Sequence, residues 1–388
     1  MRRFVPLTSF VFTCLLLAGC GGAAAPASSA PPAAPSQAAP ASSVAAAKPS
    51  AATSAAASAK PAASAGAASK PAGSAEASAP ASIAPAKPGQ VIAAYSEIVG
   101  ANTALWGAKE GGFFEKNGLN VDVRYIESSL VVPALLSGQV QYGSVGGSET
   151  LAAAVQGGDM KILATTTPVY PYKFEVAKDI QNANDLKGKK IGISRIGSSS
   201  DIATRAGLKK LGLDPDKDVS LVQTGSLAAR TAAIKSGAIQ AAMANPPDTL
   251  TLEDLGFHPL IDLAAEKLPA SNNGITIQGA YLAAHKAEVQ KYVDSVVQAI
   301  AREKKDRAFS EQVMGQYLKI DDKRLLDAAY DYWIGTTTPS LPFPKVEQFT
   351  DSVAILADKN PAAKDFNVGN LLDPSFVQSA ADRGLDKS

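Results

Sequence analysis

Serine, glycine, asparagine and arginine residues gather in four short segments, where hydroxyl, amide, guanidinium and free backbone N–H groups could hold a small molecule. The segments span residues 96–102, 146–148, 195–201 and 245–247. Each follows an apolar run of strand length, and ligands on open α/β sheets bind beyond the carboxyl ends of the strands. The predicted ligand-binding residues are Ser96, Ile98, Asn102, Ser128, Gly146, Gly147, Ser148, Arg195, Ser198, Ser199, Ser200 and Asn245.

The segment 195–201 is suited to an anionic group. Hydroxyl and free N–H groups at a helix N-terminus favour negative charge, so this segment could bind a carboxylate, sulfonate or phosphate. Arg195 could be the counter-ion of such a group, or it could form a surface salt bridge instead. The spacing from Ser198 to Asp201 also fits helix capping, so ligand contact and capping are both open for this segment.

Two other segments have equally simple alternatives. In 96–102, Gly100 allows close approach of the backbone to a ligand, but the segment could also cap a helix that begins near Thr103. In 146–148, paired glycines could present backbone N–H groups, or they could form an ordinary tight turn.

The remaining candidates are weaker. Two prolines hold Asn245 in place, although the segment could also be a plain loop before a helix. Ser128 and Ser129 follow another predicted strand. Trp106 and Tyr172 could stack on a ring, but an aromatic residue on a helix face more often lies in the core.

Residue types needed for catalysis or metal binding are scarce. Cys14 and Cys20 are the only cysteines, and both lie in the leader, so a chain cleaved before Cys20 keeps no thiolate nucleophile in its folded part. His258 and His285 are far apart and lack paired metal-ligand spacing. No Gly-x-Ser-x-Gly motif is present. We therefore predict a protein that is not an enzyme and has no metal and no cofactor.

The N-terminus has the pattern of a bacterial export signal. Arg2 and Arg3 precede an apolar run over residues 10–18 that is too short to span a bilayer comfortably. The residues Leu17-Ala18-Gly19-Cys20 resemble a lipobox. We predict a signal peptide over residues 1–19 and lipid attachment at Cys20, which would anchor the protein to a membrane. The alternative is a secretory signal that is cleaved elsewhere.

Residues 20–88 consist almost wholly of Ala, Ser, Pro and Gly with scattered Lys. Such a segment buries too little apolar surface to offset the entropy of ordering, so we predict a disordered tether between the lipid and the folded part. The whole chain has a net charge of +1, and the leader and tether hold an excess of positive charge. The part after residue 88 is therefore mildly acidic, which argues against nucleic-acid binding.

From residue 89 onward, two similar series of strands and helices follow one another. The first has predicted strands at 91–95, 121–125, 142–145 and 162–164, and the second at 191–194, 219–222 and 241–244. Alternation of strands and helices indicates mostly parallel sheets with helices on both faces. We predict an α/β solute-binding domain over residues 89–388 with two lobes. Lobe 1 comprises about 90–176 plus 276–388, and lobe 2 about 177–275.

Several motifs give this region a resemblance to a known family. They are the stretches at residues 95–102, 105–114, 135–143, 185–194, 211–216 and 233–242, which include Leu135-Leu136-Ser137-Gly138, Asp185-Leu186-Lys187-Gly188 and Leu211-Gly212-Leu213-Asp214. In this order they resemble the nitrate/sulfonate/taurine and thiamine-precursor branch of ABC-transporter solute-binding proteins. The resemblance implies a two-lobed periplasmic binding protein-like fold of type 2, in which the lobes close on a ligand by a hinge motion.

The resemblance also implies partners and a location. The expected protein is a monomeric extracytoplasmic lipoprotein that delivers its ligand to the permease and ATPase subunits of an ABC importer. A binding subunit that signals to a membrane sensor is the alternative, and a fold-related enzyme is a weaker one. Enzymes of related fold depend on cysteine, which the part after residue 88 lacks.

The ligand class is less sharply defined. Sulfonates, nitrate-like oxyanions, pyrimidines and aromatic compounds all fit the resemblance. The four segments contain many Ser, Gly and Asn residues and few basic ones. This composition favours a neutral or singly charged organic molecule over a small anion held by several cations.

Overall fold

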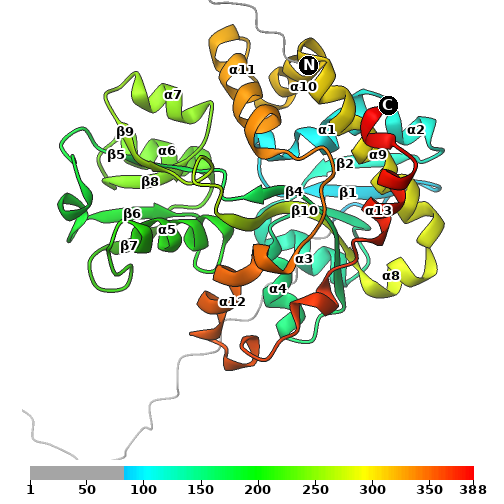
Figure 1. The fold of residues 1–388 in the computed structure, drawn as a ribbon, viewed down its shortest axis with the longest axis horizontal. Coiled ribbons are helices and arrows are strands. Elements are labelled where there is room, and N and C mark those ends of the chain that lie inside the picture. The colour runs from blue at the N-terminus through cyan, green and yellow to red at the C-terminus, as the bar shows by residue number, and fades with distance from the viewer. Residues whose placement is uncertain (1–82) are drawn as a thin grey trace, which may run out of the picture. The chain divides into compact units, whose positions relative to one another are not determined.

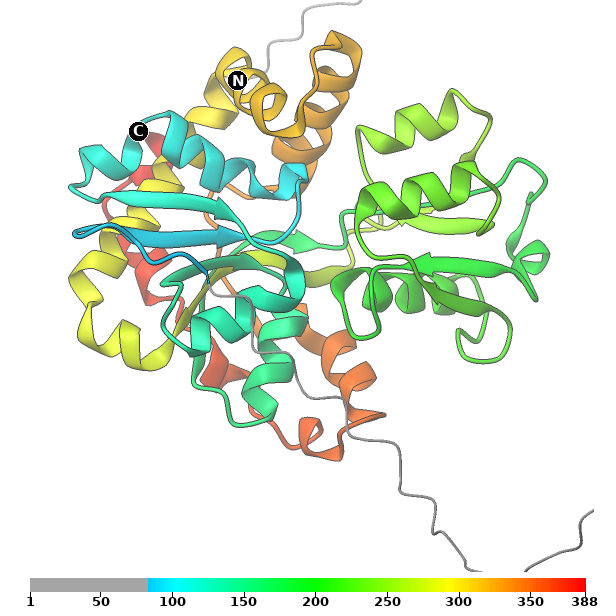
Figure 2. The same ribbon diagram turned by 180° about the vertical axis from the view of Figure 1, so that it is seen from behind.

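The computed structural model describes residues 83–388. The predicted signal peptide, the lipid-attachment residue Cys20 and nearly all of the tether lie outside the described residues. Two five-stranded sheets organise the described part, and each has helices of its own (Figures 1 and 2). We call the sheet β2-β1-β3-β10-β4 with its helices lobe 1, and the sheet β7-β6-β8-β5-β9 with its helices lobe 2.

The sheet of lobe 1 is mostly parallel. Its strands are β1 (Val91–Tyr95), β2 (Val121–Tyr125), β3 (Tyr142–Val145), β4 (Met160–Val169) and β10 (Pro269–Gln278). β1 pairs in parallel with β2 and β3, with Val91 opposite Val121 and Ala93 opposite Tyr142. β10 is antiparallel to both β3 and β4. β1 is almost continuously apolar because helices cover both faces of the sheet.

Lobe 2 repeats this arrangement. Its strands are β5 (Lys173–Val176), β6 (Lys190–Ile193), β7 (Ser220–Gln223), β8 (Ala241–Ala244) and β9 (His258–Asp262). β6 pairs in parallel with β7 and β8, while β5 is antiparallel to β8 and β9. The fold class predicted from the sequence, an α/β protein with two lobes built on mostly parallel sheets, is confirmed.

The helices complete both lobes. Before the chain first crosses to lobe 2, lobe 1 has the helices α1 (Thr103–Glu110), α2 (Phe113–Lys116), α3 (Ser128–Leu136) and α4 (Gly147–Val155). Lobe 2 has α5 (Ser199–Lys210), α6 (Leu227–Lys235) and α7 (Asp248–Glu253). The C-terminal part has α8 (Gly279–Ala284), α9 (Lys286–Lys305), α10 (Arg307–Leu318), α11 (Lys323–Tyr330), α12 (Thr350–Ala357) and α13 (Ser375–Asp382). A π-helical segment, Asp331–Thr337, extends α11.

Shorter 3₁₀ segments connect these elements. They are Gly100–Asn102, Ala183–Leu186, Val346–Phe349, Pro361–Ala363, Val368–Leu371 and Leu385–Lys387. The helix predicted to begin near Thr103 ends at Glu110, and a second short helix, α2, follows after a break. The break falls at Gly111-Gly112, where Gly112 has a φ of 67°, a value that glycine adopts without steric cost.

The chain passes between the lobes twice. It crosses from β4 to β5 at residues 170–172 and returns from β9 to β10 at residues 263–268. Both crossings lie earlier in the chain than the predicted boundaries at 176 and 275. The reason is that β5 contains Lys173 and Glu175, and β10 begins with polar residues, so no apolar run marked either strand.

Most apolar packing lies within one lobe, but one cluster joins Val99 and Trp333 to Ala264 in the second crossover and to Leu227 of α6. Ile92, Leu135 and Ile162 lie in one core of lobe 1, and Phe174 and Ile191 lie in the core of lobe 2. Within residues 83–388, no helix combines the length and apolar character needed to cross a membrane.

Aromatic residues fill a second core of lobe 1. Trp106 is fully buried and stacks on Tyr317 with ring centroids 4.6 Å apart. Tyr95 packs edge-on against the same indole ring. Trp106 is therefore a core residue, as expected for an aromatic residue on a helix face, and it has no contact with the cleft described below.

Three further contacts join the lobes. The buried indole of Trp333 donates from Nε1 to the carbonyl of Pro246 in lobe 2 at 2.9 Å. The exposed Arg324 of α11 forms an ion pair with Asp254, which follows α7, at 2.5 Å. Tyr170 donates to Asp351 of α12 at 2.9 Å. α11 and α7 face each other on one side of the molecule, and α12 lies on the opposite side (Figure 1).

Candidate ligand-binding cleft

A cleft lined by both lobes lies at the carboxyl ends of the parallel strands. Its outer part is a cavity of about 380 Å³, and its inner part is a narrow recess of about 30 Å³. The two parts share Ser96, Glu97, Val99 and Ser128. The inner recess is also lined by Ala101, Asn102, Gly146, Glu149, Tyr172, Ser199, Asn272 and Asn273. The outer cavity adds Ile98, Tyr125, Glu127, Ser194, Arg195, Ser198, Gly225, Ser226, Leu227 and Ala228.

Glu97 occupies the junction of the two parts. It follows β1, and its carboxylate forms no hydrogen bond and no ion pair with any residue in 83–388, although the side chain lines both cavities. Desolvation by burial raises the pKa of Glu97, and Glu149 raises it further, while Arg230 and Arg195 oppose the rise. Sequence reasoning included the segment 96–102 but did not single out this residue.

An amide network holds the loop that presents Glu97. Asn102 Nδ2 donates to the backbone carbonyl of Glu97 at 2.7 Å. Asn102 Oδ1 accepts from Ser144 Oγ at 2.7 Å and from Asn273 Nδ2 at 3.1 Å. Because Asn102 is almost fully buried and bonded on both sides, it fixes the conformation of the loop. Its side chain makes no capping bond to the helix that follows.

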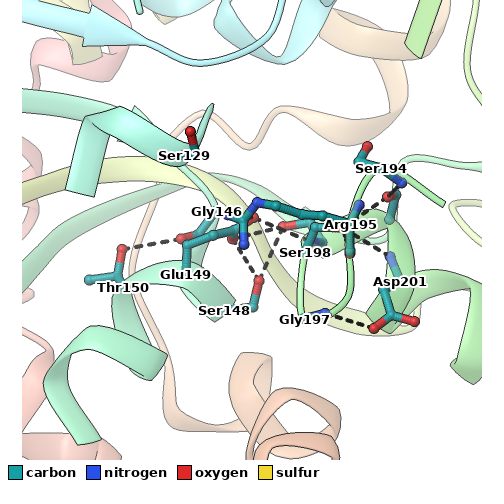
Figure 3. Close-up of polar contacts among 12 residues, drawn as sticks. Ser129, Gly146, Ser148, Glu149, Thr150, Ser194, Arg195, Gly197, Ser198 and Asp201 are labelled. Atoms are coloured by element: carbon teal, nitrogen blue, oxygen red, sulfur yellow. Dashed lines mark hydrogen bonds and ion pairs between the residues drawn. The ribbon is translucent and has the colours of Figure 1, made fainter. Parts of the chain in front are cut away.

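Glu149 joins lobe 1 to lobe 2 across the cleft. Its Oε2 accepts from Ser148 Oγ at 2.7 Å and from Ser199 Oγ at 3.3 Å, and its Oε1 lies 3.6 Å from Arg195 Nη2. Figure 3 shows the long Arg195 side chain extending from its loop toward Glu149 and Gly146. Arg195 was predicted as the counter-ion of an anion or as part of a surface salt bridge, and it lies both in the cleft and beside a carboxylate.

A second arginine lies behind the wall of lobe 2. Arg230 of α6 is 1% exposed and forms no ion pair among the residues that the structure describes. Its Nη1 donates to Ser194 Oγ at 2.6 Å, and its Nε donates to the carbonyl of Met243 at 3.1 Å. Ser194 and Gly225, which both contact this guanidinium group, line the outer cavity. A lone arginine in an Ala-rich helix gave no signal in the sequence.

Two further polar groups face the inner recess. Tyr172, in the first crossover, is almost fully buried, and desolvation together with the nearby Glu97 raises the pKa of its phenol. Asn272 Oδ1, on β10, is buried without a hydrogen-bond partner among residues 83–388. Asn272 and Asn273 were missed by sequence reasoning because a polar run inside a strand resembles a loop.

The structure brings most of the predicted residues into the cleft. Those that line it are Ser96, Ile98, Asn102, Ser128, Gly146, Arg195, Ser198 and Ser199. Ser198 also caps α5 by accepting from the Asp201 N–H at 3.3 Å, so capping and cleft lining fall on one residue. Whether these side chains bind a ligand is still a prediction.

Four predicted residues lie outside the lining. Gly147 packs tightly, since a Cβ there would lie 2.3 Å from Ser271 Oγ. Ser148 bonds to Glu149, and the buried Ser200 accepts from the Ser194 N–H at 2.9 Å, so both support the loops. Asn245 lines a neighbouring cavity with Pro246 and Pro247. Ser129, a weaker candidate, bonds to Glu127 instead.

Metal binding finds no support in the described part of the chain. Within residues 83–388, no three His, Cys, Asp or Glu side chains are grouped so that they could hold a metal ion. The polar groups of the cleft are carboxylates, amides, hydroxyls and guanidinium groups, which are suited to hydrogen bonding with an organic molecule.

Two lobes, two crossovers and a cleft between them define a periplasmic binding protein fold, and comparison with solved structures agrees. The alkanesulfonate-binding protein SsuA from Xanthomonas axonopodis, bound to MOPS, is 22% identical with a TM-score of 0.59 and covers 76% of this chain and 98% of its own. The nitrate-binding protein NrtA from Synechocystis is 15% identical with a TM-score of 0.60 and covers 76% and 89%. The desulfurization enzyme DSZB is 18% identical with a TM-score of 0.50 and covers 76% and 100%.

Sequence comparison then identifies the family. The family described as NMT1/THI5 like matches residues 101–306, and the chain belongs to it. This result confirms the family resemblance seen in the sequence motifs. A comparison with curated proteins found no match.

Proposed function

We propose that this protein is an extracytoplasmic solute-binding lipoprotein of an ABC importer, which captures a small organic or anionic molecule between its lobes by hinge closure. The observation that carries the proposal is a cleft with polar groups from both lobes and a volume of about 380 Å³, within the range of small-molecule sites. The first crossover begins where β4 ends, and the second ends where β10 begins. These two crossovers are the natural hinge between lobe 1 and lobe 2.

The likeness to known binding proteins supports a transport role. The SsuA and NrtA structures share the fold of this chain, and their names give an alkanesulfonate and nitrate as the molecules that they bind. The lipid anchor at Cys20, the tether and the contact with permease and ATPase subunits rest on the sequence pattern and the family. We infer an exported, membrane-anchored monomer from the same pattern.

Two other functions are also compatible with this fold and cleft. A sensor subunit would use the same cleft and differ only in its membrane partner. An enzyme is conceivable because a desulfurization enzyme has this fold. The residues between 83 and 388 include no cysteine, and the two histidines, His258 and His285, do not line the cleft. We therefore infer binding without catalysis.

Thermal unfolding of the full chain in the presence of single compounds tests the proposal. The panel comprises sulfonates, oxyanions, pyrimidines and aromatic acids. A compound that binds only the folded state stabilises it by about 2.7 kcal/mol at 100 times its dissociation constant, so a true ligand raises the melting temperature. A saturable rise for one class supports solute capture. Turnover of the bound compound, followed by chromatography, would contradict the binding role and favour the enzyme.

A further inference from the structure

Glu97 is the one charged group of the cleft lining that lacks a partner among residues 83–388. Glu149 is paired with Arg195 and accepts from two serine hydroxyls. Glu127, at the rim of the outer cavity, accepts from the backbone N–H and the hydroxyl of Ser129. Glu97 therefore lines both cavities, and its carboxylate has no hydrogen-bond partner among residues 83–388.

The groups around Glu97 favour a hydrogen-bond donor in the inner recess. Asn272 Oδ1 is a second acceptor there without a partner, and Glu149 is a second carboxylate. An anion in this recess would meet the unpaired carboxylate of Glu97, and like charges repel more strongly away from water. A group that donates N–H bonds would instead give a partner to the buried Asn272 Oδ1 and to the Glu97 carboxylate.

Neither arginine can neutralise Glu97 by contact. Arg195 points toward Glu149, and Arg230 is held behind Ser194 by bonds to a hydroxyl and to carbonyl oxygens. Neither forms an ion pair with Glu97 among the described residues. Both guanidinium groups act on Glu97 only from a distance, so a positively charged group on the bound molecule would supply the contact partner that this carboxylate lacks.

The outer cavity offers an apolar surface next to this carboxylate. Ile98, Tyr125, Leu227 and Ala228 all line it, and Ile98 and Tyr125 are about half exposed. A molecule whose nitrogen reaches Glu97 would place its hydrocarbon or aromatic body against these side chains, which removes apolar surface from water.

We propose that the solute carries a cationic or hydrogen-bond-donating nitrogen group, such as an amine, an amidine or an amino group on a heteroaromatic ring, and that Glu97 binds this nitrogen. Tyr172 and Asn272 share the donor hydrogens in the inner recess. The inference rests on the proposed solute-binding function, whose ligand it narrows to a chemical class.

Calorimetric titration of the full chain with matched pairs of compounds tests this assignment. The pairs are benzylamine and benzyl alcohol, 4-aminopyrimidine and 4-hydroxypyrimidine, and 2-aminoethanesulfonate and propane-1-sulfonate. The variant is Glu97→Gln, which keeps size and removes charge. The matched control is Glu347→Gln, which makes the same change at an exposed glutamate outside the cleft lining. Circular dichroism verifies that both variants fold.

The expected result is that at least one nitrogen compound binds at least tenfold more tightly than its partner, and that Glu97→Gln removes this preference while Glu347→Gln keeps it. Equal or tighter binding of the compounds without the nitrogen would overturn the inference and leave solute binding intact. Unchanged amine affinity in Glu97→Gln would also overturn it. Silence of every nitrogen compound would overturn it too, and silence of the whole panel would in addition count against the proposed function.

Discussion

The two lobes share one architecture but present different chemistry to the cleft. Each is built on a five-stranded sheet in which four strands run in one direction and one strand, β10 or β5, is antiparallel to both of its neighbours. Lobe 1 lines the cleft with acceptors, namely Glu97, Glu149 and Asn272. Lobe 2 lines it with Arg195 and the serines of 194–199, and Arg230 lies behind Ser194. The repeated fold therefore fixes where the functional groups lie and leaves their charge free to differ.

The cores of the lobes are alike in a second respect. Each buries one glutamate whose two carboxylate oxygens have no partner among residues 83–388, Glu303 in lobe 1 and Glu175 in lobe 2. Burial raises the pKa of each to about 8, and Glu253 adds to the effect at Glu175. The two lobes are thus similar in burying an unpaired glutamate and different in the charge of the residues that line the cleft. Each half of this comparison can be tested.

The largest expected effect concerns the buried glutamates. A carboxyl group with a raised pKa in the folded state stays protonated there while the unfolded chain ionises, so stability falls as the pH rises from about 4.5 to about 8. Replacing Glu303 or Glu175 by Gln should remove up to roughly 4–5 kcal/mol of this fall for each site. Urea unfolding at pH 5, 6, 7 and 8 measures it.

The exposed Glu347→Gln serves as the control for this series. If only one of the two variants flattens the pH profile, the interiors of the lobes are not alike. A steep profile in both variants would contradict the assignment of protonated glutamates.

The next largest effect is expected for a substitution of Arg230, which supports the part of lobe 2 that lines the cleft. Arg230→Met removes the donors to Ser194 and Met243 and keeps an unbranched side chain, so a partly buried hydroxyl and a buried carbonyl lose a partner. The free energy of unfolding should fall by about 2–4 kcal/mol. Chemical denaturation measures it, with Arg230→Lys as a comparison that keeps the charge. A variant as stable as the parent would mean that the wall does not depend on this guanidinium group.

The smallest effect concerns the ion pair that joins the opposite walls. Glu149 and Arg195 lie 3.6 Å apart and Arg195 is partly exposed, so a double-mutant cycle with Glu149→Gln and Arg195→Met should give a coupling below about 1 kcal/mol. The exposed Lys217–Asp214 pair within lobe 2 is a matched reference. A coupling energy of several kcal/mol would contradict this prediction. It would mean that attraction between Glu149 and Arg195 contributes strongly to holding the two lobes together.

Much of the fold could be predicted from the sequence because most strands are short apolar runs. The predicted strands at 91–95, 121–125, 142–145 and 241–244 coincide with β1, β2, β3 and β8. The lobe boundaries were less accurate because β5 and the start of β10 owe their strand structure to pairing in the sheet rather than to their own composition.

The cleft was predicted in part. Hydroxyl and glycine residues after strands gave a usable signal, and Ser96, Ser128 and Ser199 lie where that signal put them. Among the charged residues, Arg195 was predicted, but Glu97 and Arg230 were not, because a glutamate after a strand or an arginine on a helix normally faces water. Only the tertiary fold shows that Glu97 and Arg230 approach the same cleft.

The contacts that join the lobes beside the cleft have a consequence for the time that a bound solute stays in place. Arg324–Asp254 is an exposed ion pair and Arg195–Glu149 a partly exposed one, whereas Trp333 and Pro246 meet in a buried contact. Dissolved salt screens the exposed pairs and hardly affects the buried one. For a solute held as proposed, the escape rate should therefore follow the ionic strength of the surroundings, even where its own contacts with the cleft are insensitive to salt.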